Sequence, residues 1–212
     1  LAACCMGTMT SCSDFLDASN KSNVTAKQSF ATKEGLNNLV NNAYQHLQNV
    51  YAAPLFTSCF SAGTDMYADA RNKMNEALNT YETLTPENTD IKNLYTYLYS
   101  GIRAANSVSY YAQTAQVDEK TKGQLVGEAR VLAAYEYYLL VNNFGGVPIM
   151  KDFLTTADTG YPKSSAADVY AYIISELEDV ISKNVLQAST ATKGGGRISQ
   201  ETAKAILAKT YL

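Results

Sequence analysis

The stretch that most constrains the fold covers residues 127–150 and has the sequence GEARVLAAYEYYLLVNNFGGVPIM. It begins with helix-forming residues and is apolar and aromatic over residues 131–141. The Phe-Gly-Gly-Val-Pro sequence that follows ends a helix, because glycine loses much backbone entropy and proline has no N–H to donate. We therefore predict a helix that stops near Asn143. Apolar residues lie on more than one of its faces, so we expect it to be buried from several sides as the central helix.

Other segments carry similar helical signals, with apolar residues recurring every three or four positions. The expected helices span residues 33–51, 85–113, 118–143, 165–184 and 199–212. The residues expected to cap or begin them are Thr32, Thr85, Asp118, Ser165 and Ser199. Consecutive helices joined by short loops form helical hairpins, and these lengths suit an irregular tetratricopeptide-like repeat, although no strict repeat period is visible. The predicted fold class is all-α, with few or no strands.

Composition narrows the classes of protein to which the chain can belong. Its 212 residues are 46% hydrophobic and 17% charged, which is typical of a globular chain that needs no disulfide or metal to fold. The formal net charge is −3 and the basic residues are scattered, so we expect no nucleic-acid partner. The chain has 16 tyrosines and no tryptophan, so we expect an aromatic ring that stacks on a ligand to be a tyrosine.

The N-terminal sequence LAACCMGTMTSCSDFLD is small and apolar up to Cys12 and then polar. It resembles the end of a secretory signal followed by a lipoprotein processing site, where a cysteine receives the lipid. Cys4 and Cys12 are both candidates, and the residues before Cys4 fit a generic lipoprotein signal better. We predict that residues 1–12 are a signal-peptide remnant, residues 13–29 a flexible tether and residues 30–212 the α-helical domain.

Several segments in the same order resemble the SusD/RagB family of glycan-capture lipoproteins. Residues 127–150 share the family's acidic-Ala-basic start, its aromatic run and its Phe-Gly-Gly-Val-Pro end. Residues 99–106 match the pattern Tyr-x-x-Ile-x-x-Ala-Asn, and the last helix with its preceding Gly-Arg also matches. The Ser-Asp-Phe-Leu-Asp sequence after Cys12 is typical of the position just after the family's lipidated cysteine, so the resemblance favours Cys12 over Cys4.

The resemblance implies a function as well as a fold. Family members are lipid-anchored on the outside of the outer membrane, capture oligosaccharides and deliver them to a TonB-dependent (SusC-like) transporter without catalysis. Family chains continue well beyond the length of this one, so we expect residues 30–212 to be the N-terminal portion of such a protein. An alternative is a helical-repeat scaffold that binds the transporter and has no glycan site of its own.

The predicted glycan contacts lie in the loop after the first long helix, at Asp65, Tyr67, Asp69 and Arg71. This loop resembles the family's loop in which an aspartate and nearby basic or aromatic residues face the glycan. A carboxylate accepts hydrogen bonds from sugar hydroxyls, a guanidinium donates them, and a tyrosine ring stacks on a pyranose. The alternative is a solvated loop in which Asp69 pairs with Lys73 on a helix.

Signals for catalysis, metals and cofactors are weak. His46 is the only histidine, no two cysteines form a C-x-x-C pair, and we expect neither a metal site nor a cofactor. Glycosidase carboxylates can come from distant segments, so hydrolysis remains a minor alternative. We assign structural roles to Arg103 and to Asn106, whose amide is expected to bond the backbone of a neighbouring segment. Cys59 is expected to be a buried free cysteine.

Overall fold

The structure is a computed structural model that describes residues 25–52, 54–67, 76–154, 160–192 and 196–212. The helices are α1 (Ala26–Ser29), α2 (Lys33–Tyr51), α3 (Leu55–Phe60), α4 (Glu76–Thr80), α5 (Thr89–Ala112), α6 (Glu119–Phe144), α7 (Ala166–Lys183), α8 (Ser189–Thr192) and α9 (Gln200–Tyr211). Across these ranges the only β feature recorded is an isolated antiparallel bridge between Pro148 and Lys163. The predicted all-α fold class is confirmed.

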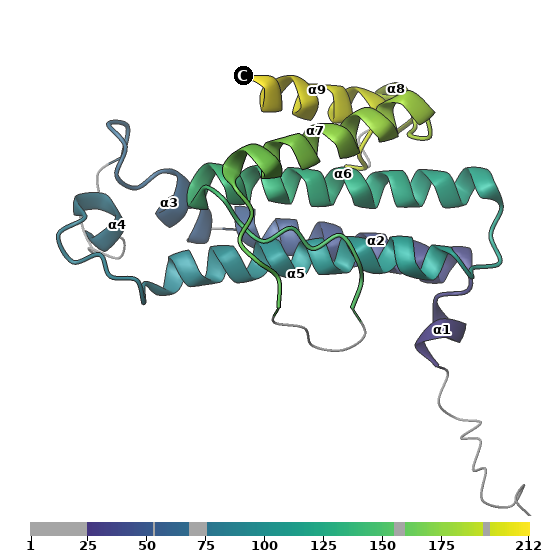
Figure 1. Cartoon of the computed structure of the whole chain (residues 1–212), viewed down its shortest axis with the longest axis horizontal. Helices are drawn as coiled ribbons and strands as arrows, with labels where there is room; N and C mark the ends of the chain where they lie inside the picture. Colours follow the sequence, from purple (N-terminus) through teal and green to yellow (C-terminus); the bar gives the residue numbers. More distant parts are fainter. Residues whose placement is uncertain (1–24, 53, 68–75, 155–159, 193–195) are drawn as a thin grey trace, which may run out of the picture.

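Helix α6 is the centre of the arrangement, as predicted, and contacts α2, α5, α7 and α9. Helices α5 and α6 form a hairpin through a short connection, with α2 packed against both of them. Figure 1 shows α7 and α9 stacked on the other side of α6, so the helices form successive layers. The α6 side chains that touch these layers are buried on several faces, including Leu132, Tyr137 and Leu140. Burial from several sides explains why the apolar residues of α6 are not confined to one stripe.

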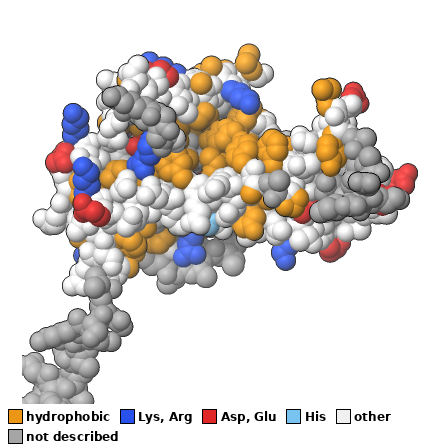
Figure 2. Space-filling view, turned by 180° about the vertical axis from the view of Figure 1, so that it is seen from behind, with side chains coloured by type: hydrophobic (Ala, Val, Ile, Leu, Met, Phe, Trp, Pro, Cys, Tyr) orange, Lys and Arg blue, Asp and Glu red, His pale blue; other side chains and the backbone are white. Residues whose placement is uncertain are grey.

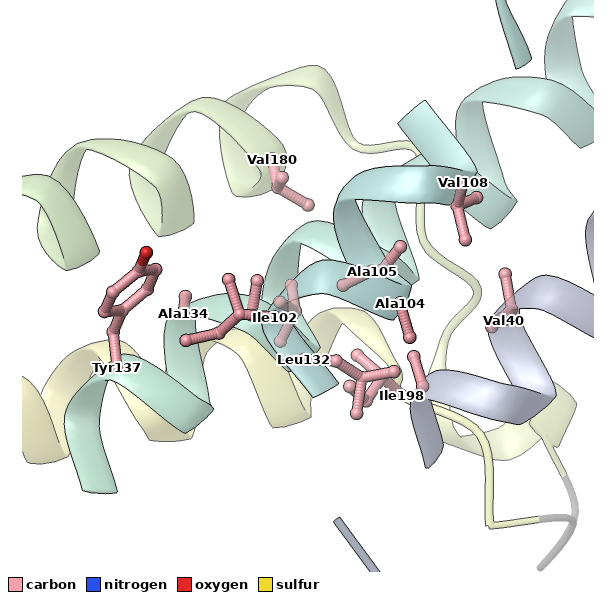
Figure 3. Close-up of a cluster of buried hydrophobic side chains, with 14 of the residues drawn as sticks. Val40, Ile102, Ala104, Ala105, Val108, Leu132, Ala134, Tyr137, Val180 and Ile198 are labelled. Atoms are coloured by element: carbon pink, nitrogen blue, oxygen red, sulfur yellow. The ribbon is translucent and has the colours of Figure 1, made fainter. Parts of the chain in front are cut away.

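The core draws residues from every layer. Figure 3 shows Val40 of α2, Ile102 and Val108 of α5, Leu132 of α6 and Val180 of α7 within one cluster of buried hydrophobic side chains. The exposed fraction of each of these side chains is 0–1%. Burial of apolar surface at about 25 cal/mol per Å² makes such a cluster the main source of stability.

Most predicted helix ends are confirmed by their hydrogen bonds. The backbone N–H groups of Gly35, Thr121, Asp168 and Thr202 donate to the predicted caps Thr32, Asp118, Ser165 and Ser199 at 2.9–3.2 Å. Helix α6 ends one residue later than expected, at Phe144, where Gly145 takes a φ of 69°. Helix α7 ends at Lys183, and its C-cap Asn184 adopts a left-handed conformation with a φ of 49°. These are the polar caps and C-terminal residues that helix geometry favours.

The predicted helix start at Thr85-Pro86-Glu87 is wrong. Residues 85–88 form a turn in which the Asn88 N–H donates to the Thr85 carbonyl at 3.1 Å. Helix α5 begins at Thr89, because the Asn88 side chain accepts from the backbone N–H groups of both Asp90 and Ile91, at 3.0 and 3.1 Å. A cap that satisfies two backbone donors is a stronger start signal than the Thr-Pro-Glu sequence before it.

Residues 25–29, which lie within the predicted tether, are ordered as the short helix α1. Thr25 and Gln28 form a reciprocal capping box at its start. Phe30 follows and packs its ring against Tyr111, with ring centres 4.8 Å apart. The predicted boundary between the tether and the α-helical domain at residue 30 stays a prediction. Cys4 and Cys12 lie outside the described residues, as does most of the predicted tether.

None of the helices in the described ranges combines the length and the apolar character that crossing a bilayer requires.

Candidate functional site

The loop between α3 and α4 holds two of the predicted glycan-binding residues in described positions. Asp65 is exposed and Tyr67 is half-buried, with the Tyr67 N–H donating to the Thr64 carbonyl at 3.2 Å. Asp69 and Arg71 lie outside the described residues. The assignment of Asp65, Tyr67, Asp69 and Arg71 as ligand residues therefore stays a prediction.

An apolar base supports this loop. A cavity of about 320 Å³ beneath it is lined mainly by hydrophobic side chains, including Leu78, Leu84, Leu94 and Phe144. Gly63 bonds Asn79 through its N–H at 3.3 Å and has a φ of 75°, a left-handed conformation that suits glycine. This hydrogen bond attaches the loop to α4.

Cys59 contributes to the same cavity and is a free, half-buried cysteine. Burial, followed by the nearby charge of Asp90, raises the pKa of its thiol to about 11. A thiol with a raised pKa is a poor nucleophile, because the thiolate is the reactive form. The predicted packing role of Cys59 agrees with this, although the side chain is only half-buried.

A second hollow lies against the side of α5 and has a volume of about 560 Å³. Tyr95, Tyr99 and Arg103, spaced four residues apart, line it from one face of the helix, because residues at i, i+4 and i+8 project from the same side. The remaining lining residues are Thr96, Ser100, Pro148, Met150 and Tyr161. We call this hollow the α5 groove. Its volume falls in the range of roughly 300–1,000 Å³ that is usual for small-ligand sites.

The outer wall of the α5 groove comes from the segment after α6, which Figure 1 shows crossing α5. The wall is fixed by hydrogen bonds to the helices behind it. The Tyr99 hydroxyl donates to the Pro148 carbonyl at 2.7 Å, and the Asn106 amide donates to the Met150 carbonyl at 2.8 Å. The Met150 N–H donates to the Tyr137 hydroxyl at 2.7 Å. The predicted role of Asn106 as a bond to a neighbouring backbone is confirmed.

The aromatic side chains of the groove are held in place by other rings. Tyr95 and Tyr99 have ring centres 4.8 Å apart, and Tyr95 also meets the ring of Phe144 edge-on at 5.1 Å. Burial, followed by the hydrogen bond with Tyr95, raises the pKa of Tyr99, so its hydroxyl remains protonated and able to donate. The groove thus offers ordered ring surfaces with hydroxyl groups beside them, which suits a ligand that has both apolar faces and hydroxyl groups.

Arg103, for which the sequence analysis favoured a structural role, has an exposed side chain that lines the groove, and its role stays a prediction. Its guanidinium lies over the Phe153 ring, with Cζ 5.7 Å from the ring centre. Sequence reasoning also overlooked Tyr99, although its spacing from Tyr95 and Arg103 is visible in the sequence. The groove could not be predicted from α5 alone, because its opposite wall comes from residues about 50 positions further along the chain.

No acid–base pair lines the α5 groove, since none of the described lining residues has a carboxylate or an imidazole. The described part of the chain also contains no group of three or more His, Cys, Asp or Glu residues that could hold a metal ion. His46 lies elsewhere, on α2, half-buried, and burial lowers its pKa. The described lining of the groove offers aromatic rings, hydroxyl groups and a guanidinium as contacts.

A stack of helical hairpins is the architecture of helical-repeat proteins. Residues 14–212 match the model of a SusD-like family described as "Starch-binding associating with outer membrane". The chain belongs to this SusD-like family, and the resemblance stated from the sequence is confirmed.

Individual relatives agree with the family assignment. A curated SusD-like protein of Formosa agariphila is 28% identical over 190 residues, which cover 87% of this chain and 36% of that protein. The solved structure of surface glycan-binding protein A from Bacteroides uniformis is 26% identical, with a TM-score of 0.71, over 84% of this chain and 41% of that one. A laminarin-binding SusD-like protein at 23% identity has the same fold, with a TM-score of 0.72 over 84% of this chain and 39% of that one. This chain therefore spans well under half the length of these relatives.

Proposed function

We propose that the chain captures glycans at the cell surface for a TonB-dependent outer-membrane transporter and makes or breaks no covalent bond. The observation that carries this proposal is the α5 groove, a tyrosine-lined hollow on a chain of the SusD-like family. A relative of similar fold is named as a surface glycan-binding protein, which supports the same class of ligand.

The chemistry of the α5 groove fits an oligosaccharide. The C–H faces of a pyranose stack on aromatic rings, and Tyr95, Tyr99 and Tyr161 supply such rings. The hydroxyl groups of a sugar need hydrogen-bond partners, which the Thr96 and Ser100 hydroxyls can supply as donors or acceptors. Since Tyr99 and the outer wall are already fixed, little side-chain entropy is lost when a ligand binds.

Replacing Tyr95 with leucine is expected to weaken glycan binding about tenfold, which corresponds to ~1.4 kcal/mol. Leucine keeps the half-buried apolar contact behind the groove but removes the ring face on which the sugar stacks. Isothermal titration calorimetry against a panel of neutral and acidic oligosaccharides measures the effect. Tyr211→Leu is the matched control, because Tyr211 is an exposed tyrosine on α9 and does not line the groove.

Titrations of one variant in the α5 groove and one in the α3–α4 loop show how much each surface contributes to glycan binding. We propose that Asp65, Tyr67, Asp69 and Arg71 extend the same glycan site as additional contacts. Asp65→Ala is expected to weaken binding by a smaller factor, because Asp65 is exposed and its hydrogen bonds to a sugar compete with water. Unchanged affinity in both Tyr95→Leu and Asp65→Ala would place the binding surface elsewhere.

A second candidate function is a scaffold whose ligand is the transporter protein itself. Aromatic side chains on α2, α3 and α6 that contact one another favour the scaffold function. Figure 2 shows that hydrophobic side chains gather on the rear face of the molecule. Tyr51 and Phe56 are 42% and 38% exposed, and Tyr51 stacks on Phe60 and shares a hydrogen bond with Tyr135. Exposed aromatic surface of this kind is typical of protein interfaces. Failure to bind any glycan, together with retained capture of the transporter, would favour the scaffold.

We propose that a lipid on Cys12 anchors the protein to the outer membrane with its folded part facing outward. Several acyl chains on one residue give firm anchoring, since each buried CH₂ contributes ~0.8 kcal/mol. Cells fed an alkyne fatty acid are expected to label the wild-type chain and the Cys4→Ala variant, but not Cys12→Ala. Labelling that survives in Cys12→Ala and disappears in Cys4→Ala would move the anchor to Cys4.

A further inference from the structure

Arg103 differs from the other arginines in the described part of the chain, because it alone has no carboxylate partner there. Arg130 binds Glu176 and Asp179 through its guanidinium, at 2.7 and 2.5 Å. Arg197 binds Glu128 at 2.7 Å. The Arg103 guanidinium lies over the face of the Phe153 ring, which cannot neutralise its charge.

The position of Arg103 allows its unpaired charge to contact a ligand in the α5 groove. Arg103 lies at the end of the row that begins with Tyr95 and Tyr99, so a saccharide stacked on the rings would reach it. None of the described residues that line the groove is acidic, so no group in the lining competes for the guanidinium. The contact with Phe153 restricts the guanidinium, which reduces the entropy lost when it binds an anion.

We propose that the α5 groove selects saccharides that carry an acidic group, and that Arg103 binds this carboxylate or sulfate while the tyrosines stack on the sugar ring. This inference rests on the proposed function, since it specifies the ligand of the glycan site. A guanidinium and a carboxylate or sulfate form two parallel N–H···O bonds, and these bonds are stronger than those to a neutral hydroxyl. A neutral saccharide would lose this contact and keep only the stacking.

The test is isothermal titration calorimetry with three probes of similar length. These are an oligogalacturonate, a sulfated galactan oligosaccharide and a neutral cello-oligosaccharide. The wild-type chain is expected to bind at least one acidic probe tenfold or more tightly than the neutral one, and added salt is expected to weaken that binding. Comparing the two acidic probes shows whether a carboxylate or a sulfate is preferred.

Arg103→Gln is expected to reduce affinity for the acidic probe at least tenfold and to leave the neutral probe unchanged. Arg103→Lys is expected to recover part of the lost affinity, since lysine keeps the charge but not the paired geometry. Lys204→Gln is the matched control, because it removes an exposed positive charge on α9, away from the groove. Arg103 is exposed, so its variants are expected to keep the thermal transition of the wild type.

The failure of this inference can be told apart from failure of the proposed function. Equal wild-type affinity for neutral and acidic probes, with no effect of Arg103→Gln, would overturn the acidic preference and leave glycan capture standing. Binding of acidic probes that Lys204→Gln weakens as much as Arg103→Gln would also overturn it, because the attraction would then be a property of the whole surface. Absence of binding to any probe would overturn both.

Discussion

Replacing Arg197 with alanine is expected to cost about 3 kcal/mol of unfolding free energy, near the lower end of the range for a broken buried ion pair. The reason is its partner, Glu128 on α6, whose side chain is 1% exposed. The Arg197 guanidinium donates to Glu128 at 2.7 Å and also to the Asn41 side chain of α2 at 2.8 Å. Without Arg197 the Glu128 carboxylate would remain buried with no opposite charge beside it. Arg197 itself is 26% exposed, so water can compensate in part.

The residues around Glu128 show why this pair matters to the fold. Gln124 and the Tyr44 hydroxyl both donate to the Glu128 carboxylate, at 3.1 Å. Tyr44 also accepts from the Ile198 N–H at 2.7 Å, and burial raises the pKa of its hydroxyl. The network therefore fastens the segment before α9 to α2 and α6, three parts of the chain that are distant in sequence.

Urea unfolding followed by circular dichroism measures the cost of Arg197→Ala. The double variant Arg197→Ala/Glu128→Gln is the control, and it should recover part of the loss because the uncompensated charge is gone. A cost below about 1 kcal/mol for Arg197→Ala would contradict the prediction, since that is the usual value of a solvent-exposed pair.

Glu136→Gln is expected to stabilise the protein at neutral pH and to change how stability depends on pH. The Glu136 side chain is completely buried on α6, and neither carboxylate oxygen has a hydrogen-bond partner among the residues that the structure describes. Burial raises its pKa well above the ordinary value of 4.5. The folded chain therefore holds a proton on Glu136 at pH values where the unfolded chain has released it. Above pH 4.5 stability should fall by up to about 1.4 kcal/mol per pH unit from this group, until the folded pKa is passed.

The measurement is the unfolding free energy of both proteins at pH 5, 6, 7 and 8. Glutamine has nearly the same shape and does not ionise, so the variant should lack the decline that Glu136 causes. Glu34→Gln, at an exposed position on α2, is the matched control and should follow the wild type. Identical pH profiles for the wild type and Glu136→Gln would show that Glu136 is ionised in the folded chain or that solvent reaches it.

Much of the fold could be predicted from the sequence, because its helix signals are local. Thr32, Ser165 and Ser199 are polar caps placed just before apolar periodic segments, and each of them caps a helix in the structure. The error at Thr85 has the same origin, since two candidate caps, Thr85 and Asn88, lie three residues apart. Only the contact of Asn88 with two backbone donors decides between them, and that contact needs the folded turn.

The α5 groove was harder to predict because its walls come from separate segments. Tyr95 falls at the helical spacing of the apolar residues of α5, and the structure makes it half-buried. The contact of Arg103 with Phe153 depends on the path of the chain after Pro148, which no local pattern specifies. The burial of Glu136 also depends on a contact between two separate helices. Gly101 on α5 leaves a notch that this carboxylate fills, since a Cβ there would lie 1.7 Å from Glu136 Oε1.

The hydrogen bonds of Tyr99, Asn106 and Tyr137 to the outer wall have a consequence for how selectivity could evolve. These side chains belong to two helices of the core, α5 and α6. The width of the groove therefore depends on the distance between these two helices. A substitution deep between those helices would widen or narrow the aperture without touching a ligand. Under the proposed function, the length of saccharide that the groove accepts would change through interior packing while every residue in the groove stays the same.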